Sequence, residues 1–143
     1  AATAYAALKL GVEQLAIFDI DQERTQQLAE KLKKHFEDKR IVAISDLESA
    51  MTGAEGVIHA TPTGMAGNSG LPLPANLLRP EMWVAEIVYF PLETELLRTA
   101  REIGCRTLDG SGMAVFQAAE AFRLFTDTAP DAQRMRRHFD SMH

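Results

Sequence analysis

The chain has 143 residues, of which 46% are hydrophobic and 24% are charged. This composition is that of an ordinary globular protein, and the length suits one compact domain, so a disordered or fibrous protein is excluded. Fifteen Lys and Arg against twenty Asp and Glu give a net charge of -5, whereas a dedicated nucleic-acid binder carries a basic excess. We therefore expect no nucleic-acid partner.

The cysteine content and hydropathy indicate a compartment. The single cysteine, Cys105, excludes an intrachain disulfide and predicts a reducing, cytoplasmic compartment. The most apolar window, residues 82–92, is interrupted by Glu86 and Pro91 and is too short to cross a bilayer, so no membrane association is expected. No positively charged, apolar leader opens the chain as given, and we expect no secretory signal.

In the first part of the chain, short apolar runs alternate with helical patterns. We expect strands at residues 15–19, 41–44 and 56–60. Helices are expected from the first residue to a stop at Gly11, from an N-cap at Asp21 to about Phe36, and from a capping box formed by Ser45 and Glu48 to about Met51.

The same alternation continues to the end of the chain. A loop rich in Gly and Pro is expected at residues 61–80, with strands at 83–89 and 106–108. Helices are expected at residues 93–103, closed by Gly104, and at 110–125 and 130–142. Strands that alternate with helices predict an α/β fold with a parallel sheet and right-handed crossovers.

Asp19 and Arg24 are candidate cofactor-binding residues. In a doubly wound sheet, an acidic residue at the end of the second strand accepts hydrogen bonds from the adenosine ribose and repels a 2′-phosphate, so Asp19 favours NAD over NADP. Arg24 would lie beside the adenine or pair with Asp19. Alternatively, Asp19 only helps to cap the helix and Arg24 is solvated. No Gly-x-Gly-x-x-Gly turn for a pyrophosphate precedes Asp19 in the sequence.

A second candidate segment is His59-Ala60-Thr61-Pro62-Thr63-Gly64-Met65, which ends a predicted strand in small and hydroxyl residues. Ligands of open α/β sheets bind beyond the carboxyl ends of the strands, so Thr61 is placed to contact a cofactor. A plain turn from strand to loop explains the segment equally well. His59 is expected to be a partly buried strand residue, and no metal site is predicted because no further ligand lies at a suitable spacing.

Two later segments carry further polar groups. Tyr89 ends a predicted strand, where its phenol reaches a ligand hydroxyl or fills the junction between strand and helix. Gly110 opens a helix and allows a flat ring to approach closely. On that helix, Gln117 lies one turn after Met113 and is expected to be a buried amide that needs a partner, either a ligand or the backbone.

Taken together and in this order, these segments resemble the shikimate/quinate dehydrogenase family. The matching pieces extend over nearly the whole chain and are Ala60-Thr61-Pro62-Thr63-Gly64-Met65, Val88-Tyr89-Phe90-Pro91 with Thr94 and Leu96-Leu97, Gly110 with Met113, and residues 117–125. The resemblance implies a Rossmann-like, doubly wound parallel sheet that lacks its first strand and glycine-rich loop. Residues 1–143 would form the dinucleotide-binding domain together with the C-terminal helices.

The resemblance also implies roles for individual residues. Asp19 and Arg24 correspond to the ribose-binding pair of the NAD-preferring branch, so NADP is the less favoured cofactor. The other implied cofactor contacts are Ala60, Thr61, Pro62, Ile87, Gly110 and Met113, and the implied substrate contacts are Tyr89 and Gln117. In this family, hydride transfer links a ring alcohol, shikimate or quinate, to its ketone, 3-dehydroshikimate or 3-dehydroquinate.

The sequence departs from the family pattern at two positions: His59 replaces the usual Asn, and Glu86 replaces the usual Asp. The extra methylene of Glu86 should be tolerated if its carboxylate only holds neighbouring backbone. The N-terminal domain of the family, with its catalytic Lys and Asp, is not in this sequence. We therefore assign no catalytic residue here, and expect the chain alone to be inactive and to bind NAD weakly.

The strands at residues 15–19 and 56–60 would lack the neighbour that they share in the usual strand order. Unpaired strand edges invite pairing with another chain. The hypothesis is that these residues belong to a longer polypeptide, and that a missing segment, a second copy in a homodimer or a rearranged register fills the gap.

Two other classes of function remain open at the level of sequence. One is a different NAD-dependent enzyme, acting on amino-shikimate or similar to glutamyl-tRNA reductase, against which Tyr89 and Gln117 favour a polyhydroxylated ring. The other is a non-catalytic, regulatory dinucleotide-binding domain.

Overall fold

The computed structural model describes residues 1–142. It divides into two compact units, residues 1–54 and the remainder from Glu55 onward. Both units contain parallel strands and helices, so the predicted α/β class is confirmed.

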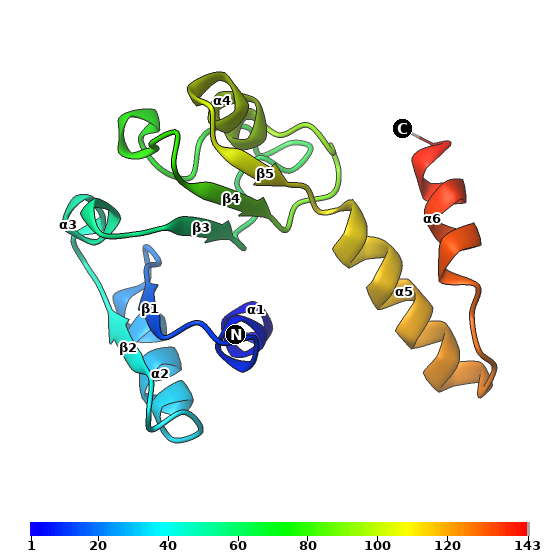
Figure 1. The fold of residues 1–143 in the computed structure, drawn as a ribbon, viewed down its shortest axis with the longest axis horizontal. Helices are drawn as coiled ribbons and strands as arrows, with labels where there is room; N and C mark the ends of the chain where they lie inside the picture. The colour runs from blue at the N-terminus through cyan, green and yellow to red at the C-terminus, as the bar shows by residue number, and fades with distance from the viewer. Residues whose placement is uncertain (143) are drawn as a thin grey trace. The chain divides into compact units, whose positions relative to one another are not determined.

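The first unit holds a two-stranded parallel sheet with helices packed on it (Figure 1). Its elements are α1 (Ala2–Lys9), β1 (Gln14–Ile17), α2 (Gln22–Lys33), β2 (Arg40–Ala43) and α3 (Leu47–Thr52). Leu8, Ala29, Leu32 and Ile41 form its buried core, which brings α1 and α2 against β2. Because apolar residues recur on one face of α2, this helix buries that face on the sheet.

The ends of these elements test the predicted caps. Asp21 caps α2 as predicted, since its carboxylate accepts a hydrogen bond from the Arg24 N–H at 3.0 Å. The predicted capping box of Ser45 and Glu48 is wrong: Asp46 caps α3 and accepts from the Ser49 N–H at 3.2 Å. The extended backbone of Asp46 lets its short carboxylate reach the free N–H groups of the first turn.

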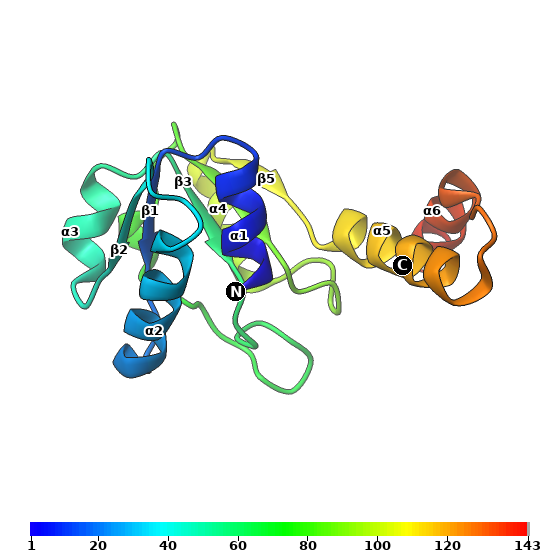
Figure 2. The ribbon, with the colours of Figure 1, turned by 90° about the horizontal axis from the view of Figure 1, so that it is seen from below.

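The second unit holds a three-stranded parallel sheet in the order β3-β4-β5. Its elements are β3 (Gly56–His59), the short 3₁₀ helix η1 (Ala75–Leu77), β4 (Trp83–Glu86), α4 (Glu95–Ile103), β5 (Arg106–Leu108), α5 (Ser111–Thr126) and α6 (Ala132–Asp140). Helix α4 packs on β4 and β5, and α5 and α6 lie side by side (Figures 1 and 2). In the described part of the chain, no helix is long and apolar enough to cross a membrane.

The core of the second unit lies between α4 and the sheet. Met82, Val84, Leu96 and Leu97 are all buried. Helix α4 is bounded by Thr94, whose hydroxyl accepts from the Leu97 N–H at 3.3 Å, and by Gly104, whose positive φ of 103° ends the helix as predicted. The helix is therefore fixed at both ends as well as along its buried face.

Strands β1 and β3 do not pair with one another in the described structure. β1 pairs only with β2, and β3 pairs only with β4, so each has one edge without a strand partner. Both are shorter than expected, because the first ends at Ile17 rather than Asp19 and the second at His59.

Candidate functional site

The candidate residues of the second unit gather where its strands end. Ala60, Thr61 and Pro62 follow β3, and Ile87 follows β4, the adjacent strand. The Ile87 N–H donates to the His59 carbonyl oxygen at 3.0 Å, which extends the pairing of the two strands by one residue. The segment 60–62 and Ile87 therefore lie next to one another at the carboxyl ends of parallel strands, where open α/β sheets bind ligands.

Gly110 approaches the same strand ends from the turn after β5. A Cβ atom at this position would lie 2.5 Å from the Val88 carbonyl oxygen and 2.8 Å from that of Ile87. The absence of a side chain thus allows the start of α5 to pack directly on the backbone that follows β4. The sequence predicted that a flat ring approaches Gly110; the group that lies close to it in the structure is the backbone of Ile87 and Val88.

The loop after β3 folds back toward Phe90. The Gly64 N–H donates to the Asn68 carbonyl oxygen at 2.7 Å, and the Ala66 N–H donates to that of Phe90 at 3.2 Å. Gly64 has a φ of 91°, which the turn requires and which residues with a side chain rarely adopt.

Tyr89 is 48% exposed, so it does not fill the junction between strand and helix, and its phenol is accessible to a ligand.

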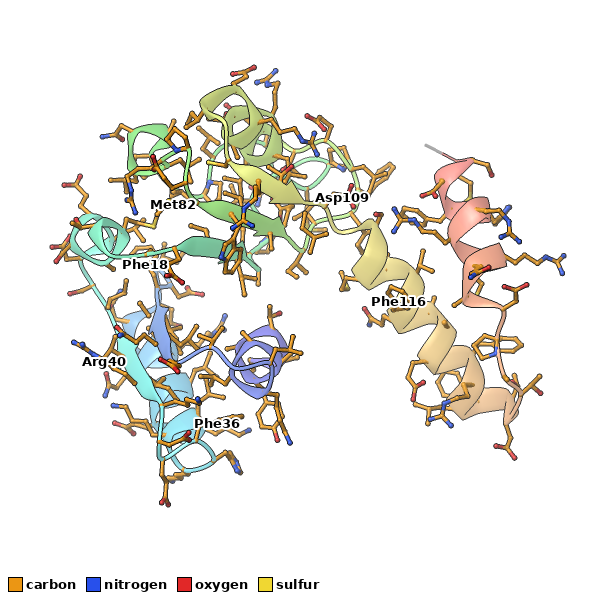
Figure 3. All side chains as sticks on the ribbon, viewed as in Figure 1. Phe18, Phe36, Arg40, Met82, Asp109 and Phe116 are labelled. Atoms are coloured by element: carbon orange, nitrogen blue, oxygen red, sulfur yellow. The ribbon has the colours of Figure 1, made fainter. Side chains whose placement is uncertain are left out.

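The prediction that Gln117 is buried is wrong, because its side chain is exposed. Helix α5 buries Ser111, Val115 and Ala119, which lie on one face. Gln117 lies two residues from Val115, or about 200° around the helix, on the opposite side. Met113 is half-buried, and Phe116, labelled in Figure 3, is exposed on the same helix.

Asp19 and Arg24 belong to the first unit and follow β1. The half-buried Asp19 accepts a hydrogen bond from the Asp21 N–H at 3.0 Å through one carboxylate oxygen, Oδ1. Arg24, with 76% of its side chain exposed, lies 3.9 Å from Asp21 instead of pairing with Asp19. The other oxygen of Asp19 has no hydrogen bond within residues 1–142, so the carboxylate fits a ribose hydroxyl donor.

The sequence interpretation missed a buried polar network behind the ends of β3 and β4. The His59 ring lies 2.8 Å from a carboxylate oxygen of Glu86 and 2.6 Å from the Thr61 hydroxyl oxygen. Glu86 also accepts hydrogen bonds from the Val88 N–H at 3.0 Å and the Thr94 hydroxyl at 3.1 Å. A signal was available, because His59 and Glu86 lie within two strands that were expected to be parallel. Glu86 thus does more than hold neighbouring backbone, because it also contacts the side chains of His59 and Thr94.

No metal centre accompanies this network. The residues described contain no group of three or more His, Cys, Asp and Glu side chains that could hold a metal ion. Besides the buried His59 and Glu86, the donors and acceptors at the strand ends are hydroxyl and backbone groups, which suit an organic ligand with its own polar groups.

Asp109, labelled in Figure 3, stabilises the turn that carries Gly110. Burial raises the pKa of its carboxyl, but hydrogen bonds from the Ser111 hydroxyl and N–H, with attraction by Arg136 and Arg101, outweigh burial and lower the pKa below its ordinary value. The ionised form is therefore the one that the folded state prefers. The stabilisation of the folded state by ionised Asp109 is present above the ordinary Asp pKa. It is lost as the pH falls through the lowered pKa of the folded state.

We expect Asp109→Ala to lower the free energy of unfolding by about 1 kcal/mol at neutral pH, as for loss of a helix cap. The deficit should shrink in acid, where the unmodified protein also loses the ionised acceptor. Asp109→Asn is the control, because it keeps an acceptor oxygen but does not titrate. Urea denaturation at neutral and acidic pH measures the difference, and a deficit that grows in acid would contradict this assignment.

Sequence comparisons identify relatives of this chain. The family described as shikimate 5′-dehydrogenase C-terminal domain matches residues 110–138. A shikimate dehydrogenase (NADP(+)) of Streptomyces avermitilis is 58% identical over 137 residues, which are 94% of this chain and 47% of the relative. A quinate/shikimate dehydrogenase (NAD(+)) of Corynebacterium efficiens is 44% identical over 143 residues, which are 99% of this chain and 50% of the relative. Over almost its whole length, the chain is similar to shikimate and quinate dehydrogenases.

Solved structures of this family have the same fold. The quinate dehydrogenase from Corynebacterium glutamicum in complex with NAD matches with a TM-score of 0.89 and 42% identity, over 98% of this chain and 50% of that chain. The shikimate 5-dehydrogenase from Thermus thermophilus in complex with NADP(H) and shikimate matches with a TM-score of 0.81 and 33% identity, over 98% and 50%. The resemblance inferred from sequence is thereby confirmed, and so is the Rossmann-like fold.

The chain spans about half the length of the shikimate and quinate dehydrogenases that it matches. It is similar to their C-terminal part, the region named by the matching family. Relatives of both cofactor types, NAD(+) and NADP(+), are similar to it.

Proposed function

We propose that the protein carrying this chain transfers a hydride between a nicotinamide dinucleotide and the ring alcohol of shikimate or quinate. The chain supplies the dinucleotide-binding part of the site. The observation that carries this proposal is the meeting of Thr61, Ile87 and Gly110 at the carboxyl ends of β3 and β4, in a chain similar to shikimate and quinate dehydrogenases. That edge of a parallel α/β sheet is where nucleotides bind.

The cofactor-binding residues proposed are Asp19, Arg24, Ala60, Thr61, Pro62, Ile87, Gly110 and Met113. When bound, the dinucleotide supplies the hydride acceptor or donor of the reaction. Around it, small residues and glycine allow backbone groups to approach the ligand closely. The Thr61 hydroxyl adds a polar group between Ala60 and Pro62.

Tyr89 and Gln117 are proposed to hold the ring alcohol. Both side chains are exposed in the described structure, so both are accessible to an external ligand. A phenol and a carboxamide together provide donors and acceptors for the hydroxyl groups of a polyhydroxylated ring. The exposure of Gln117 favours a ligand as its partner over the backbone.

We assign the proton transfer of this reaction to a second domain, which in this family carries a Lys and an Asp as the catalytic pair. The curated relatives are about twice as long as the region that matches, which supports such a domain. The residues proposed to contact the ring alcohol are Tyr89 and Gln117. A phenol and an amide are not suited to act as the general acid or base at neutral pH.

The buried, single Cys105 supports a reducing, cytoplasmic location.

We propose NAD as the preferred cofactor because Asp19 places a carboxylate where a 2′-phosphate of NADP would bind. The prediction is that Asp19→Ser raises the ratio of NADP to NAD efficiency, kcat/KM, about tenfold, or about 1.4 kcal/mol. The matched control, Asp38→Ser, changes an exposed carboxylate of the same unit and should leave the ratio unchanged. Steady-state kinetics with both dinucleotides measure it, and equal ratios in all three proteins would refute the assignment.

The proposed function is tested by assaying the protein that carries this chain with shikimate and with quinate, each with NAD and with NADP. We expect reduced nicotinamide to form with at least one pair. The 143-residue chain alone is a useful comparison, and we expect it to show no turnover and weak NAD binding. Lack of any turnover by the longer protein, or turnover by the isolated chain, would contradict the proposal.

A further inference from the structure

We infer that His59 and Glu86 form a positioning pair that fixes the Thr61 hydroxyl as a hydrogen-bond acceptor toward the dinucleotide. The pair would thereby select an N–H or O–H donor of that ligand, such as a ribose hydroxyl or the nicotinamide carboxamide, over a phosphate oxygen. This inference rests on the proposed function, since it concerns the ligand of the same strand ends.

The pair is built into the sheet. His59 and Glu86 are register partners in the last positions of β3 and β4, which are adjacent and parallel (Figure 1). Partners in adjacent strands project from the same face, so the two side chains meet. They are 5% and 2% exposed, respectively, and buried polar groups of this kind must satisfy their hydrogen bonds within the protein.

The neighbours of Glu86 all act as donors. The Val88 N–H donates to Oε1, the oxygen that also faces His59, and the Thr94 hydroxyl donates to Oε2. Thr94 accepts the Leu97 N–H, so its own proton is available to Glu86. Thr94 is also the N-cap of α4, and the positive end of the helix dipole stabilises a nearby carboxylate. Both carboxylate oxygens of Glu86 therefore act as acceptors.

A carboxylate beside Nδ1 fixes the imidazole tautomer. In the tautomer that we infer, Nδ1 of His59 carries the proton and donates it to Glu86, which leaves Nε2 as an acceptor. The Thr61 oxygen lies 2.6 Å from Nε2. At that distance the two atoms are hydrogen-bonded, and with Nε2 as the acceptor the Thr61 hydroxyl is the donor. The Thr61 proton is therefore committed to His59.

This arrangement determines which kind of ligand group the remaining lone pairs of the Thr61 oxygen can bind. Once its proton points at His59, the Thr61 oxygen can only accept. The Thr63 N–H donates to it at a long 3.4 Å, and the Thr63 hydroxyl oxygen, the other acceptor within reach of the Thr61 proton, also lies at 3.4 Å. A donor on the ligand finds a free acceptor there. An imidazole with a proton on Nε2 would instead donate to the Thr61 oxygen. The hydroxyl proton of Thr61 would then be free to bind a phosphate oxygen.

A double-mutant cycle tests this arrangement in the protein that carries the chain, with NAD affinity as the readout. We expect His59→Leu and Thr61→Val each to weaken NAD binding about tenfold, the value of one lost hydrogen bond, and the double variant to weaken it no further. His59→Gln, which can donate and accept at once, should recover most of the affinity. His35→Leu, the same change at an exposed histidine outside the network, should have no effect.

Losses that add to about a hundredfold in the double variant would overturn the inference, because His59 would then act independently of Thr61. Nitrogen NMR of the unmodified protein gives a test that requires no variant to fold. We expect the His59 ring to be protonated at Nδ1 and not at Nε2. A proton on Nε2 overturns the inference while leaving the proposed function intact, whereas absence of any NAD or NADP binding refutes both.

Discussion

Gly110→Ala is expected to destabilise the protein by about 1–3 kcal/mol, because the new methyl group has no room. Its Cβ would lie 2.5 Å from the Val88 carbonyl oxygen, and the obstacle is backbone rather than a flexible side chain. The φ of Gly110 is -76°, so the backbone conformation itself is open to alanine and the cost is steric. Relief of the clash must move the start of α5 away from the backbone at Ile87 and Val88, and we expect dinucleotide binding to weaken as well.

Gly112→Ala provides a matched control for this change. Its Cβ would lie 3.8 Å from the nearest atom, a nitrogen of Arg136, and the residue is within α5. Alanine in a helix is favoured over glycine by about 0.5–1 kcal/mol, so this variant should be slightly more stable than the unmodified protein. Urea denaturation measures both. An unchanged free energy of unfolding for Gly110→Ala would show that the close packing at this turn is wrong.

Leu97→Ala should lower the free energy of unfolding by about 2–5 kcal/mol, the range for removal of a fully buried leucine side chain. Leu97 is 0% exposed, and its helix packs on β4 and β5. Its N–H also bonds to Thr94, which holds Glu86, so a shift of α4 into the cavity would disturb the polar network at the strand ends.

The control for Leu97 is Leu10→Ala, the same substitution at a residue that is 88% exposed. Surface substitutions of this kind usually change stability by less than about 0.5 kcal/mol. Chemical denaturation followed by circular dichroism measures the two variants. Equal effects at the two positions would contradict the buried placement of α4.

Local signals in the sequence were sufficient for most of the elements. The N-cap at Asp21 and the stop at Gly104 were predicted because each acts through atoms within a few residues of itself. The cap of α3 was misassigned by one residue, to Ser45, since Ser45 and Asp46 are both good caps and the backbone angles choose between them. The strand ends were predicted less well, because where a ladder stops depends on the neighbouring strand.

The candidate site also contains features that the sequence predicted and features that it did not. The positions of Thr61 and Gly110 were predicted from motifs, because strand ends and glycine turns are visible in the sequence. Tyr89 was expected to end a strand, but β4 ends earlier, at Glu86. The exposure of Gln117 was not predicted, since it depends on which face of α5 finds a partner. Nor did any local pattern indicate that the backbone at Ile87 and Val88 lies against Gly110.

By itself, the sequence determined the α/β class, the order of strands and helices and the family, because periodicity, caps and spaced motifs are local properties of the chain. Only the tertiary structure decided that His59, Glu86, Thr61 and Thr94 form one network. Glu86 lies 27 residues from His59 in the sequence, and only the parallel pairing of β3 with β4 brings their side chains within hydrogen-bonding distance. Hydrogen bonds between strands depend on register, which is set by the packing of the whole unit.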